Sequence, residues 1–421
     1  MAQALAKTYD RQQSVQIKEF SSYQKFVIAM LAFLQFTIIL DFMMMSPLGA
    51  VMMPALNITP KQFGFAVSAY AFSGGCSALC AAGFADRFDR KKFLLFFYCG
   101  FVLGTLFCGV ANSYTMLLCA RMVTGVFAGV MGSIILAITT DLFPLEMRGR
   151  VMGYVQTAFA ASQIMGLPVG LYLSNLWGWH APFLVIVGIS VVVGVVVWKQ
   201  LKPIDSHLSL IGAKQTASKH LVATLLSPHY RLAFILTLFL SLAGFMLMPF
   251  GSAFTVHNLG IPIETLPLIY LVSGFSSIIS GPVVGRAADF IGKYKVFCFG
   301  GTLAIIIVGI YTNLGTTPLA LVMFVNVILF VSIFSRIIPA QALISAIPEP
   351  AKRGSFMSVN SALQQLSGGV GSVLAGLIVS EGPDHKIVHF NIVGYIIMGT
   401  VALTMVLMYF INKTVTERTQ L

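Results

Sequence analysis

The amino-acid sequence predicts an all-α polytopic membrane protein with twelve transmembrane helices in two pseudo-symmetric six-helix bundles. Three observations predict this fold class. The chain has 57% hydrophobic and 10% charged residues, and its mean hydropathy of +0.88 is far above that of soluble domains. Its apolar residues form repeated runs of membrane-crossing length. Two pairs of charged landmarks recur at nearly the same offset along the chain.

Apolar runs of membrane-crossing length occur twelve times. A helix that crosses the hydrocarbon core, about 30 Å thick, needs about 20 mostly apolar residues. The runs lie near 26–54, 62–83, 93–111, 115–140, 151–174 and 181–198, and then near 231–256, 265–285, 296–314, 318–346, 356–379 and 389–411. The polar segment between the two sets is typical of a solvated linker. We therefore predict an N-terminal tail (1–24), an N-terminal six-helix bundle (25–199), a linker (200–229), a C-terminal six-helix bundle (230–412) and a C-terminal tail (413–421).

Basic residues predict the orientation of the chain in the membrane. If the N-terminus is cytoplasmic, 22 of the 26 Lys and Arg residues fall in the tails, the linker and the loops on the cytoplasmic side. Lys61 and Lys386 fall on the opposite side, and Arg121 and Arg336 fall within spans. Cytoplasmic loops of membrane proteins carry an excess of Lys and Arg. Both termini and the linker are therefore expected on the cytoplasmic side.

A charged stretch between the second and third runs (82–92) has a weaker copy between the eighth and ninth (285–295). Asp86 and Asp289 are 203 positions apart, and the Arg-Gly pairs that begin at Arg148 and Arg353 are 205 positions apart. Two unrelated landmarks with nearly one offset predict two halves in parallel repetition.

Composition and motifs argue against several function classes. The formal charge of +12 would suggest nucleic-acid binding in a soluble protein, but membrane orientation explains these basic residues better. Cys76 and Cys80 share a helix face and are a conceivable metal pair, although packing as small apolar residues is the simpler explanation. The sequence contains no nucleophile motif, P-loop or zinc motif. We therefore expect no enzyme activity, no cofactor, no metal and no nucleic-acid partner.

The motifs of this chain resemble those of the major facilitator superfamily, and most closely its twelve-span drug/proton antiporter group. The family's loop motif reads roughly Gly-x-x-x-Asp-Arg-x-Gly-Arg-Lys. The chain matches it at Asp86, Arg87, Arg90 and Lys91, with Ala82 and Asp89 in place of the glycines. A second copy of the loop motif keeps Gly285, Asp289, Gly292 and Lys293. The fourth span carries an arginine–glycine motif at Arg121, Gly125 and Gly129. The fifth span has a partial Gly-Pro core at Gly166, Pro168 and Gly170.

The resemblance implies the major facilitator fold, with a central cavity lined by the first, fourth, seventh and tenth spans. It also implies a charge latch, in which Asp86 caps the start of the eleventh span, where unpaired N–H groups carry partial positive charge. Arg87 and Arg90 would pair across the interface between the halves, and Asp289 would serve the corresponding latch of the second half. A latch that must break when the halves move is a gating element. Positive-inside anchoring is the alternative explanation for the basic residues.

Three charged residues lie deep inside predicted spans: Asp41 in the first, Arg121 in the fourth and Arg336 in the tenth. An ionised side chain at the centre of a membrane helix costs about 2.5–3.5 kcal/mol, so it faces a cavity or a partner. Asp41 has two possible roles, as the permanently ionised partner of an arginine or as a carrier that loads and releases a proton. We predict the proton-coupling role, with Arg121 modulating the proton. Arg336 would bind an anionic group of the substrate or act on Asp41 by proximity.

Flexible Met side chains near Asp41 suit an adaptable pocket for lipophilic molecules. Besides Arg336, the predicted substrate contacts come from the first, fifth, seventh and eleventh spans: Thr37, Met44, Met45, Gln163, Met248 and Gln364. Ordinary packing is the alternative for each Met, and hydrogen bonding between helices is the alternative for the two Gln residues.

The favoured function is secondary active transport by alternating access, with proton-coupled export of a small amphipathic or lipophilic compound. The expected partners are this substrate, protons and membrane lipid, and a monomer would suffice. The first alternative is an uptake symporter or facilitator for a small organic anion, and the second is a non-transporting membrane receptor or lipid scramblase. By the resemblance, this multi-pass antiporter would work in efflux across a bacterial cytoplasmic (inner) membrane.

Overall fold

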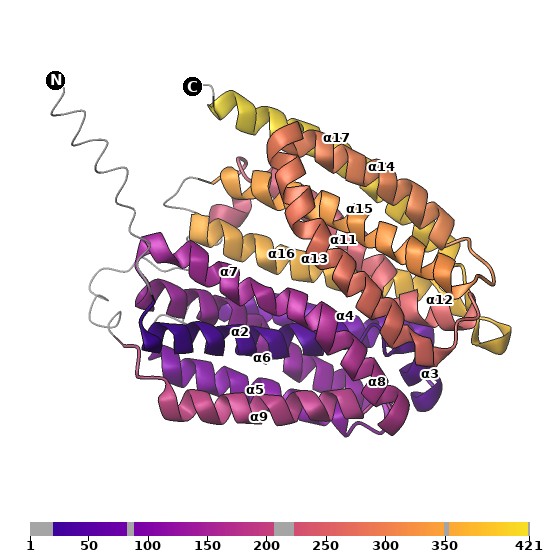
Figure 1. Cartoon of the computed structure of the whole chain (residues 1–421), viewed down its shortest axis with the longest axis horizontal. Coiled ribbons are helices and arrows are strands. Elements are labelled where there is room, and N and C mark those ends of the chain that lie inside the picture. The colour runs from indigo at the N-terminus through magenta and orange to yellow at the C-terminus, as the bar shows by residue number, and fades with distance from the viewer. Residues whose placement is uncertain (1–19, 82–87, 206–222, 349–352, 420–421) are drawn as a thin grey trace.

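Two series of helices make up the protein, as the computed structural model shows (Figure 1). The structure describes residues 20–81, 88–205, 223–348 and 353–419. The first series is α2 (Ser22–Met44), α3 (Gly49–Leu56), α4 (Pro60–Ala81), α5 (Arg90–Gly109), α6 (Tyr114–Leu142), α7 (Leu145–Ala161), the π-helical turn η2 (Ser162–Gly166), α8 (Leu167–Trp177) and α9 (Ala181–Gln200). The second is α11 (Arg231–Leu247), η4 (Met248–Phe250), α12 (Gly251–His257), η5 (Ile263–Thr265), α13 (Leu266–Ile291), α14 (Lys293–Tyr311), α15 (Leu319–Ala346), α16 (Arg353–Ile378), β1 (Ser380–Glu381), η7 (Pro383–His385), β2 (Ile387–Val388) and α17 (Phe390–Thr419).

The helices run between two ends of the molecule (Figure 1). We call the end with α3, α12 and the antiparallel β1–β2 pair the hairpin end. We call the end with the start of α2, residues 201–205 and the end of α17 the linker end. Here the backbone N–H of Arg90 donates to the carbonyl of Ile204, and the N–H of Ile204 donates to the Asp89 carboxylate at 3.2 Å. The first residues of the predicted linker are therefore bound to the start of α5.

Ten helical stretches in the described part of the chain are long and apolar enough to cross a membrane. The remaining two predicted spans are helical but fall short. In the fifth, η2 separates α7, of 17 residues, from α8, of 11 residues. In the eleventh, α16 has 26 residues, but frequent Ser, Gly, Asn and Gln make it less apolar. The all-helical class holds, whereas the count of twelve spans remains a prediction.

Local sequence signals explain where several helices begin. The Ser21 hydroxyl accepts from the Gln24 N–H, and the Gln24 side chain accepts from the Ser21 N–H, which is a capping box at the start of α2. The Asp89 carboxylate accepts from the Lys92 N–H at 2.9 Å and caps α5. Gly292 has a φ of 108°, which suits glycine, and it separates α13 from α14.

The two halves repeat one structural irregularity. α2 ends at Met44 and α11 ends at Leu247, and each is followed by a short turn and a second helix, α3 or α12. These two ends are 203 positions apart, the same offset that separates Asp86 from Asp289. The repetition predicted from the charged landmarks is therefore present in the backbone of the first helix of each half.

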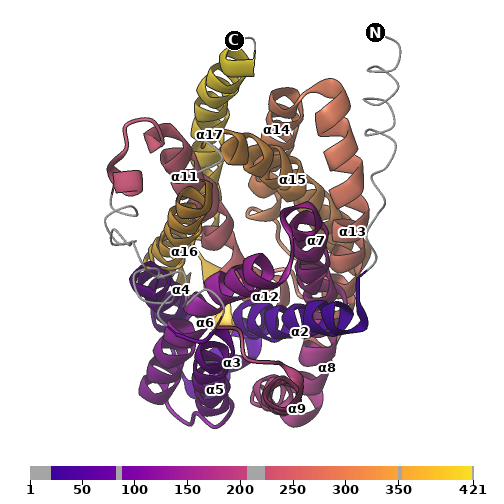
Figure 2. The ribbon, with the colours of Figure 1, turned by 90° about the vertical axis from the view of Figure 1, so that its left-hand side faces the viewer.

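Close helix contacts join the halves along two seams. The view from the linker end shows α4 beside α16 on one side and α7 beside α13 on the other (Figure 2), and the residue contacts agree. Glycines permit the first seam, because a Cβ atom at Gly64 would lie 2.8 Å from the carbonyl oxygen of Ser372. Small residues let helix backbones approach in this way where the surrounding lipid is as apolar as the side chains.

Inside the N-terminal half, α6 packs on α4 through Gly129. A Cβ atom at Gly129 would overlap the carbonyl oxygen of Gly74. We expect Gly129→Val to lower the free energy of unfolding by about 1–3 kcal/mol, because the helices must separate to admit the side chain. Thermal unfolding in detergent measures this loss. Gly132→Val is the matched control, since a Cβ atom there has no neighbour within 4 Å, and equal stability of the two variants would contradict the prediction.

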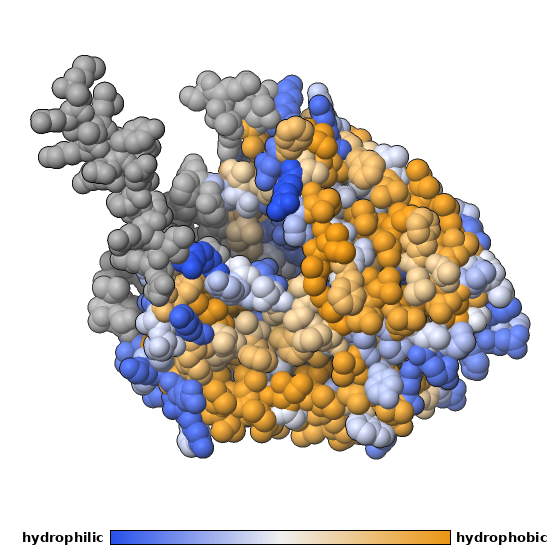
Figure 3. Space-filling view, in the orientation of Figure 1, coloured by the Kyte–Doolittle hydropathy of each residue, from blue (hydrophilic) through white to orange (hydrophobic). Residues whose placement is uncertain are grey.

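The outer surface between the two ends is apolar. Figure 3 shows hydrophobic residues along the side of the molecule and hydrophilic residues at its ends. Large apolar side chains there are strongly exposed, among them Val192 (64%), Ile279 (65%) and Phe299 (62%). Exposed apolar surface on this scale is unfavourable in water and favourable in hydrocarbon. The surface thus agrees with a protein that lies in a bilayer.

Candidate functional site

A buried ion pair joins α2 to α6 inside the N-terminal half. The Arg121 Nη1 atom donates to the Asp41 Oδ2 atom at 2.9 Å, and the Thr105 hydroxyl of α5 donates to the Asp41 Oδ1 atom at 3.2 Å. Both charged side chains are 0% exposed. Among the Asp and Glu side chains whose burial the structure describes, Asp41 alone is buried. We call Asp41, Thr105 and Arg121 the Asp41 centre.

The remaining surroundings of Arg121 are only partly polar. Its guanidinium carbon lies 4.4 Å from the centre of the Tyr70 ring of α4, within the range of a cation–π contact. Its Nε and Nη2 atoms are buried and have no hydrogen-bond partner among the described residues. Arg121 therefore depends on Asp41 for its charge-assisted hydrogen bond. Loss of the negative charge on Asp41 would leave a buried cation without its counter-ion, which is costly.

The sequence analysis assigned Asp41 and Arg121 to one proton site, and the structure places these two residues in contact. Arg336 does not lie beside them. Arg336 lies on α15 in the C-terminal half and is 6% exposed. Its Nη2 atom donates to the Thr404 hydroxyl of α17 at 3.3 Å, and its guanidinium lies 6.0 Å from the Phe297 ring centre. Among the described residues, no acidic side chain forms an ion pair with it. Arg336 thus occupies a separate, partly satisfied cation site.

The predicted substrate contacts of the first span are buried. The Thr37 hydroxyl is buried and lies 3.2 Å from the Tyr98 hydroxyl of α5. Met44 and Met45 are 1% and 0% exposed. Helical spacing relates these residues to Asp41, but Tyr98 of α5 contacts Thr37, and Met44 packs against α8 and α9. Contact with a substrate would require the helices to move.

The other predicted substrate contacts lie on three different elements. Gln163 is buried in η2, and its Nε2 atom lies 3.8 Å from the Met43 sulfur. Met248 is half-buried in η4, and Gln364 is exposed on α16. Gln364 and Met248 are therefore the more accessible members of the set.

The predicted latch residues are only partly described. Asp86 and Arg87 lie outside the described residues. Arg90 forms an ion pair with Asp141 of α6 at 2.9 Å, and Asp289 forms a weaker pair with Lys293 at 3.7 Å, one helical turn away. The first pair joins two residues of the N-terminal half, and the second joins two residues of the C-terminal half. A latch between the halves therefore remains a prediction.

Sequence reasoning missed Thr105 and Tyr70 as members of the site's surroundings. Each is a polar or amphipathic residue inside an apolar run, which is a weak signal shared by many Ser and Thr residues in this chain. Hydroxyl groups inside membrane helices commonly bond to their own helix, as Thr124 does to Ala120. Nothing in the sequence distinguishes Thr105, which bonds to a carboxylate instead.

The two helix breaks meet at the hairpin end. The Ser46 hydroxyl, in the turn after α2, donates to the carbonyl of Met248 in η4. The Ser252 hydroxyl of α12 donates to the carbonyl of Ser46 at 3.0 Å. The rings of Phe63 and Phe250 pack edge to face with centres 6.1 Å apart. These contacts hold the halves together at this end, and Ser46 lies five positions after Asp41 on the same segment of the chain.

We expect removal of both hydroxyls, in Ser46→Ala/Ser252→Ala, to shift the protein toward a state in which the hairpin end is open. A hydrogen bond contributes about 0.5–1.5 kcal/mol, so the loss of two shifts the equilibrium by about fivefold or more. Spin labels at the exposed positions Ala55 and Glu264, in a background without the native cysteines, measure the separation. Ser68→Ala is the control, because that hydroxyl bonds within its own helix to Phe65. An unchanged distance distribution in the double variant would refute the prediction.

Comparison with known proteins gives a consistent result. The family model described as Major Facilitator Superfamily matches residues 31–335 and 233–421. The chain is 24% identical over 394 residues to the uncharacterized MFS-type transporter YceJ of Bacillus subtilis (strain 168), covering 90% of this chain and 94% of that one. It is 22% identical over 369 residues to multidrug resistance protein 2 of the same organism, covering 86% and 90%.

Solved structures show the same fold. A bacterial homolog of the human lysosomal transporter Spinster, in an inward-facing and unoccupied conformation, matches with a TM-score of 0.76 at 15% identity, over 95% of this chain and 99% of that one. A point mutant of the nucleoside transporter NupG matches with a TM-score of 0.74 at 14% identity, over 93% and 99%. These relatives and neighbours are transporters and not enzymes. Since the family model matches nearly the whole chain, this protein belongs to the major facilitator superfamily of membrane transporters.

Proposed function

We propose that this transporter exports a small amphipathic or lipophilic compound in exchange for protons, by alternating access. The observation that carries the proposal is the Asp41 centre, a fully buried carboxylate on a membrane-length helix that is paired with Arg121. Such residues are costly to insert and mark ion or proton pathways in transporters. The multidrug resistance proteins among the relatives support export of lipophilic compounds.

In the proposed mechanism, Asp41 is the group that takes up and releases the transported proton. Protonation removes its negative charge and weakens the bond to Arg121, whose charge then lacks a counter-ion. Protonation therefore destabilises the contact between α2 and α6, which this ion pair forms. Because α2 leads directly to Ser46 and the contact with Met248, a shift of α2 at Asp41 is transmitted to the closed hairpin end. Proton binding and opening are thereby linked through one helix.

The orientation of the protein is part of the proposal. Both termini would be cytoplasmic, as the distribution of Lys and Arg predicts. The hairpin end then faces away from the cytoplasm, and the contacts of Ser46 and Ser252 close it. We therefore assign this structure to an inward-facing state in a bacterial cell membrane. In this state Gln364 and Met248 are the accessible substrate contacts, whereas Thr37, Met44, Met45 and Gln163 would contact substrate only after rearrangement.

One observation favours the second candidate, transport of a small organic anion by symport or facilitated diffusion. Arg336 is a buried cation whose Nε atom has no hydrogen-bond partner among the described residues. A carboxylate or phosphate group of a substrate would supply both the charge and the missing acceptor. In that case Arg336 would be essential, and Asp41 would serve mainly to hold Arg121.

The direction of coupling distinguishes the candidates. Purified protein in liposomes is given a pH gradient of either sign, and uptake of a fluorescent lipophilic cation such as ethidium is compared with uptake of radiolabelled organic anions. Accumulation of the cation in vesicles with an acidic lumen supports proton exchange. Accumulation of an anion in vesicles with an alkaline lumen supports symport, and flux without dependence on the gradient supports a facilitator. Either of the last two results would overturn the proposal.

A further inference from the structure

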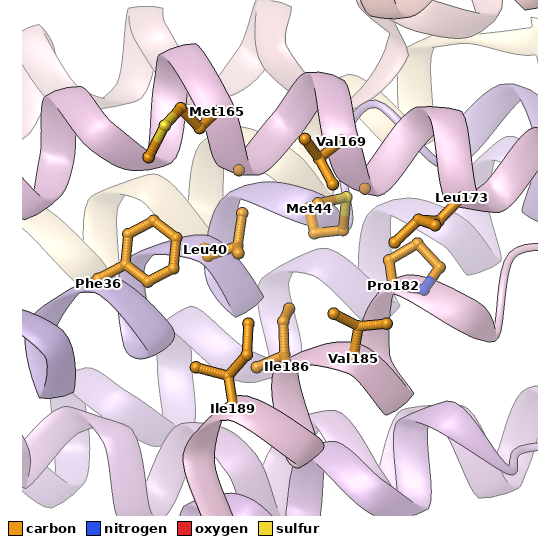
Figure 4. A pocket seen from close by; sticks show the side chains of 12 residues that line it. Phe36, Leu40, Met44, Met165, Val169, Leu173, Pro182, Val185, Ile186 and Ile189 are labelled. Carbon is orange, nitrogen blue, oxygen red and sulfur yellow. The ribbon is translucent and has the colours of Figure 1, made fainter. Parts of the chain in front are cut away.

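An apolar pocket opens on the side of the N-terminal half, away from the Asp41 centre. It has a volume of about 140 Å³ and lies between α2, α8 and α9. Figure 4 shows the side chains that surround it, including Phe36 and Leu40 from α2, Val169 from α8 and Val185 and Ile189 from α9. All twelve residues that line it are apolar.

The pocket is elongated along the helices. α2 contributes Phe36, Leu40 and Met44, which are four residues apart and therefore form one stripe along its axis. α9 contributes a parallel stripe from Pro182 to Ile189, which spans seven residues or about 10 Å at 1.5 Å per residue. A slot of this shape runs along the axes of the helices that cross the membrane. The hydrocarbon chains of a bilayer lie in the same direction.

The mouth of the pocket belongs to the surface that faces the bilayer. Met165 is 60% exposed and Val169 is 53% exposed at its rim, and Val192, on α9 just beyond it, is 64% exposed. Both α2 and α9 are long and apolar enough to cross a membrane. The slot is thus continuous with the apolar belt, so the acyl chains of membrane lipids can reach it.

The floor of the pocket is the helix that carries Asp41. Leu40 is 5% exposed and Met44 is 1% exposed. They pack on two glycines: a Cβ atom at Gly166 would lie 2.5 Å from Leu40, and one at Gly170 would overlap the end of Met44. Gly166 ends the π-helical turn η2, and such turns are frequent at functional sites. The two glycines therefore let Leu40 and Met44 lie directly against η2 and α8, where they form the floor of the pocket.

We infer that this slot is a binding site for one acyl chain of a membrane phospholipid, seated against the helix that carries Asp41. A dry apolar cavity of about 150 Å³ takes a benzene molecule, so a pocket of 140 Å³ accommodates a segment of about six carbon atoms. The absence of polar side chains among the lining residues excludes recognition of a headgroup within the slot. The inference does not depend on the proposed proton coupling, because it concerns a different face of the same helix.

A photoactivatable lipid tests the site directly. The full-length protein is placed in liposomes that contain, as a minor component, a phosphatidylcholine with a diazirine midway along one acyl chain. After irradiation, peptide mass spectrometry maps the adducts. We expect adducts concentrated on the pocket segments of α2, α8 and α9, saturating with probe concentration, and at least threefold fewer of them in Val169→Phe/Val185→Phe, which fills the mouth.

Val192→Phe is the matched control, because it adds the same bulk to the exposed face of α9 outside the pocket. It should leave the labelling of the pocket unchanged. Val169→Ala, which enlarges the mouth, should raise labelling and serves if the filled variant fails to fold. Uniform labelling of all bilayer-facing helices, unaffected by Val169→Phe/Val185→Phe, would show bulk lipid contact only and overturn the inference. An unlabelled pocket in the wild-type protein would overturn it as well.

Discussion

Asp41→Asn is expected to reduce transport driven by a pH gradient to the level of liposomes without protein. The amide has nearly the shape of the carboxylic acid and can still accept from Thr105, but it cannot take up or release a proton. Because Arg121 loses its counter-ion, the variant should be less stable than the wild type. The folded variant should still bind substrate while losing its response to the gradient. Gradient-driven dye flux and ligand-induced thermal stabilisation, measured on the same preparation, separate these two properties.

The matched control for this variant is Asp384→Asn at the hairpin end. Asp384 is exposed and has a φ of 57°, a conformation that Asn adopts readily. Its replacement should leave coupled flux at the wild-type level. Wild-type coupled flux in Asp41→Asn would remove Asp41 from the proposed mechanism, and loss of flux in Asp384→Asn would show that the assay does not report on the buried site.

Arg121→Met is expected to produce the largest loss of stability. It leaves the Asp41 carboxylate buried with Thr105 as its one remaining donor among the described residues. Removal of one partner from a buried ion pair costs about 3–5 kcal/mol, because the other charge stays in a low-dielectric interior. Unfolding in mixed detergent micelles measures this free energy. Arg231→Met, at the exposed start of α11, should change it by about 0.5 kcal/mol or less.

The double variant Asp41→Asn/Arg121→Met turns this comparison into a thermodynamic cycle. It carries no buried charge at the site, so it should recover a large part of the stability lost in Arg121→Met. Additive losses in the double variant would mean that Asp41 and Arg121 do not interact as the 2.9 Å contact indicates. The cycle measures the interaction energy between Asp41 and Arg121, and this measurement does not depend on the direction of transport.

Much of the candidate site could be found from the sequence because charges are rare in apolar runs. Asp41, Arg121 and Arg336 stand out on this ground alone. Their partners do not, since Thr105 and Tyr70 look like many other residues in the chain. The sequence also does not show that Thr37, Met44 and Met45 are buried. Helical spacing relates them to Asp41 along α2, but it does not say which of them neighbouring helices cover.

Membrane residence, the helical class and the twofold repeat follow from the sequence by itself. Hydropathy and charge are properties of short segments, and a bilayer acts on each segment separately. Tertiary structure decided that Asp41 pairs with Arg121, 80 positions away, that Arg336 stands apart in the other half, and that Ser46 meets Met248 where two broken helices touch. These contacts depend on how helices pack against one another, and packing is set jointly by side chains far apart in the chain.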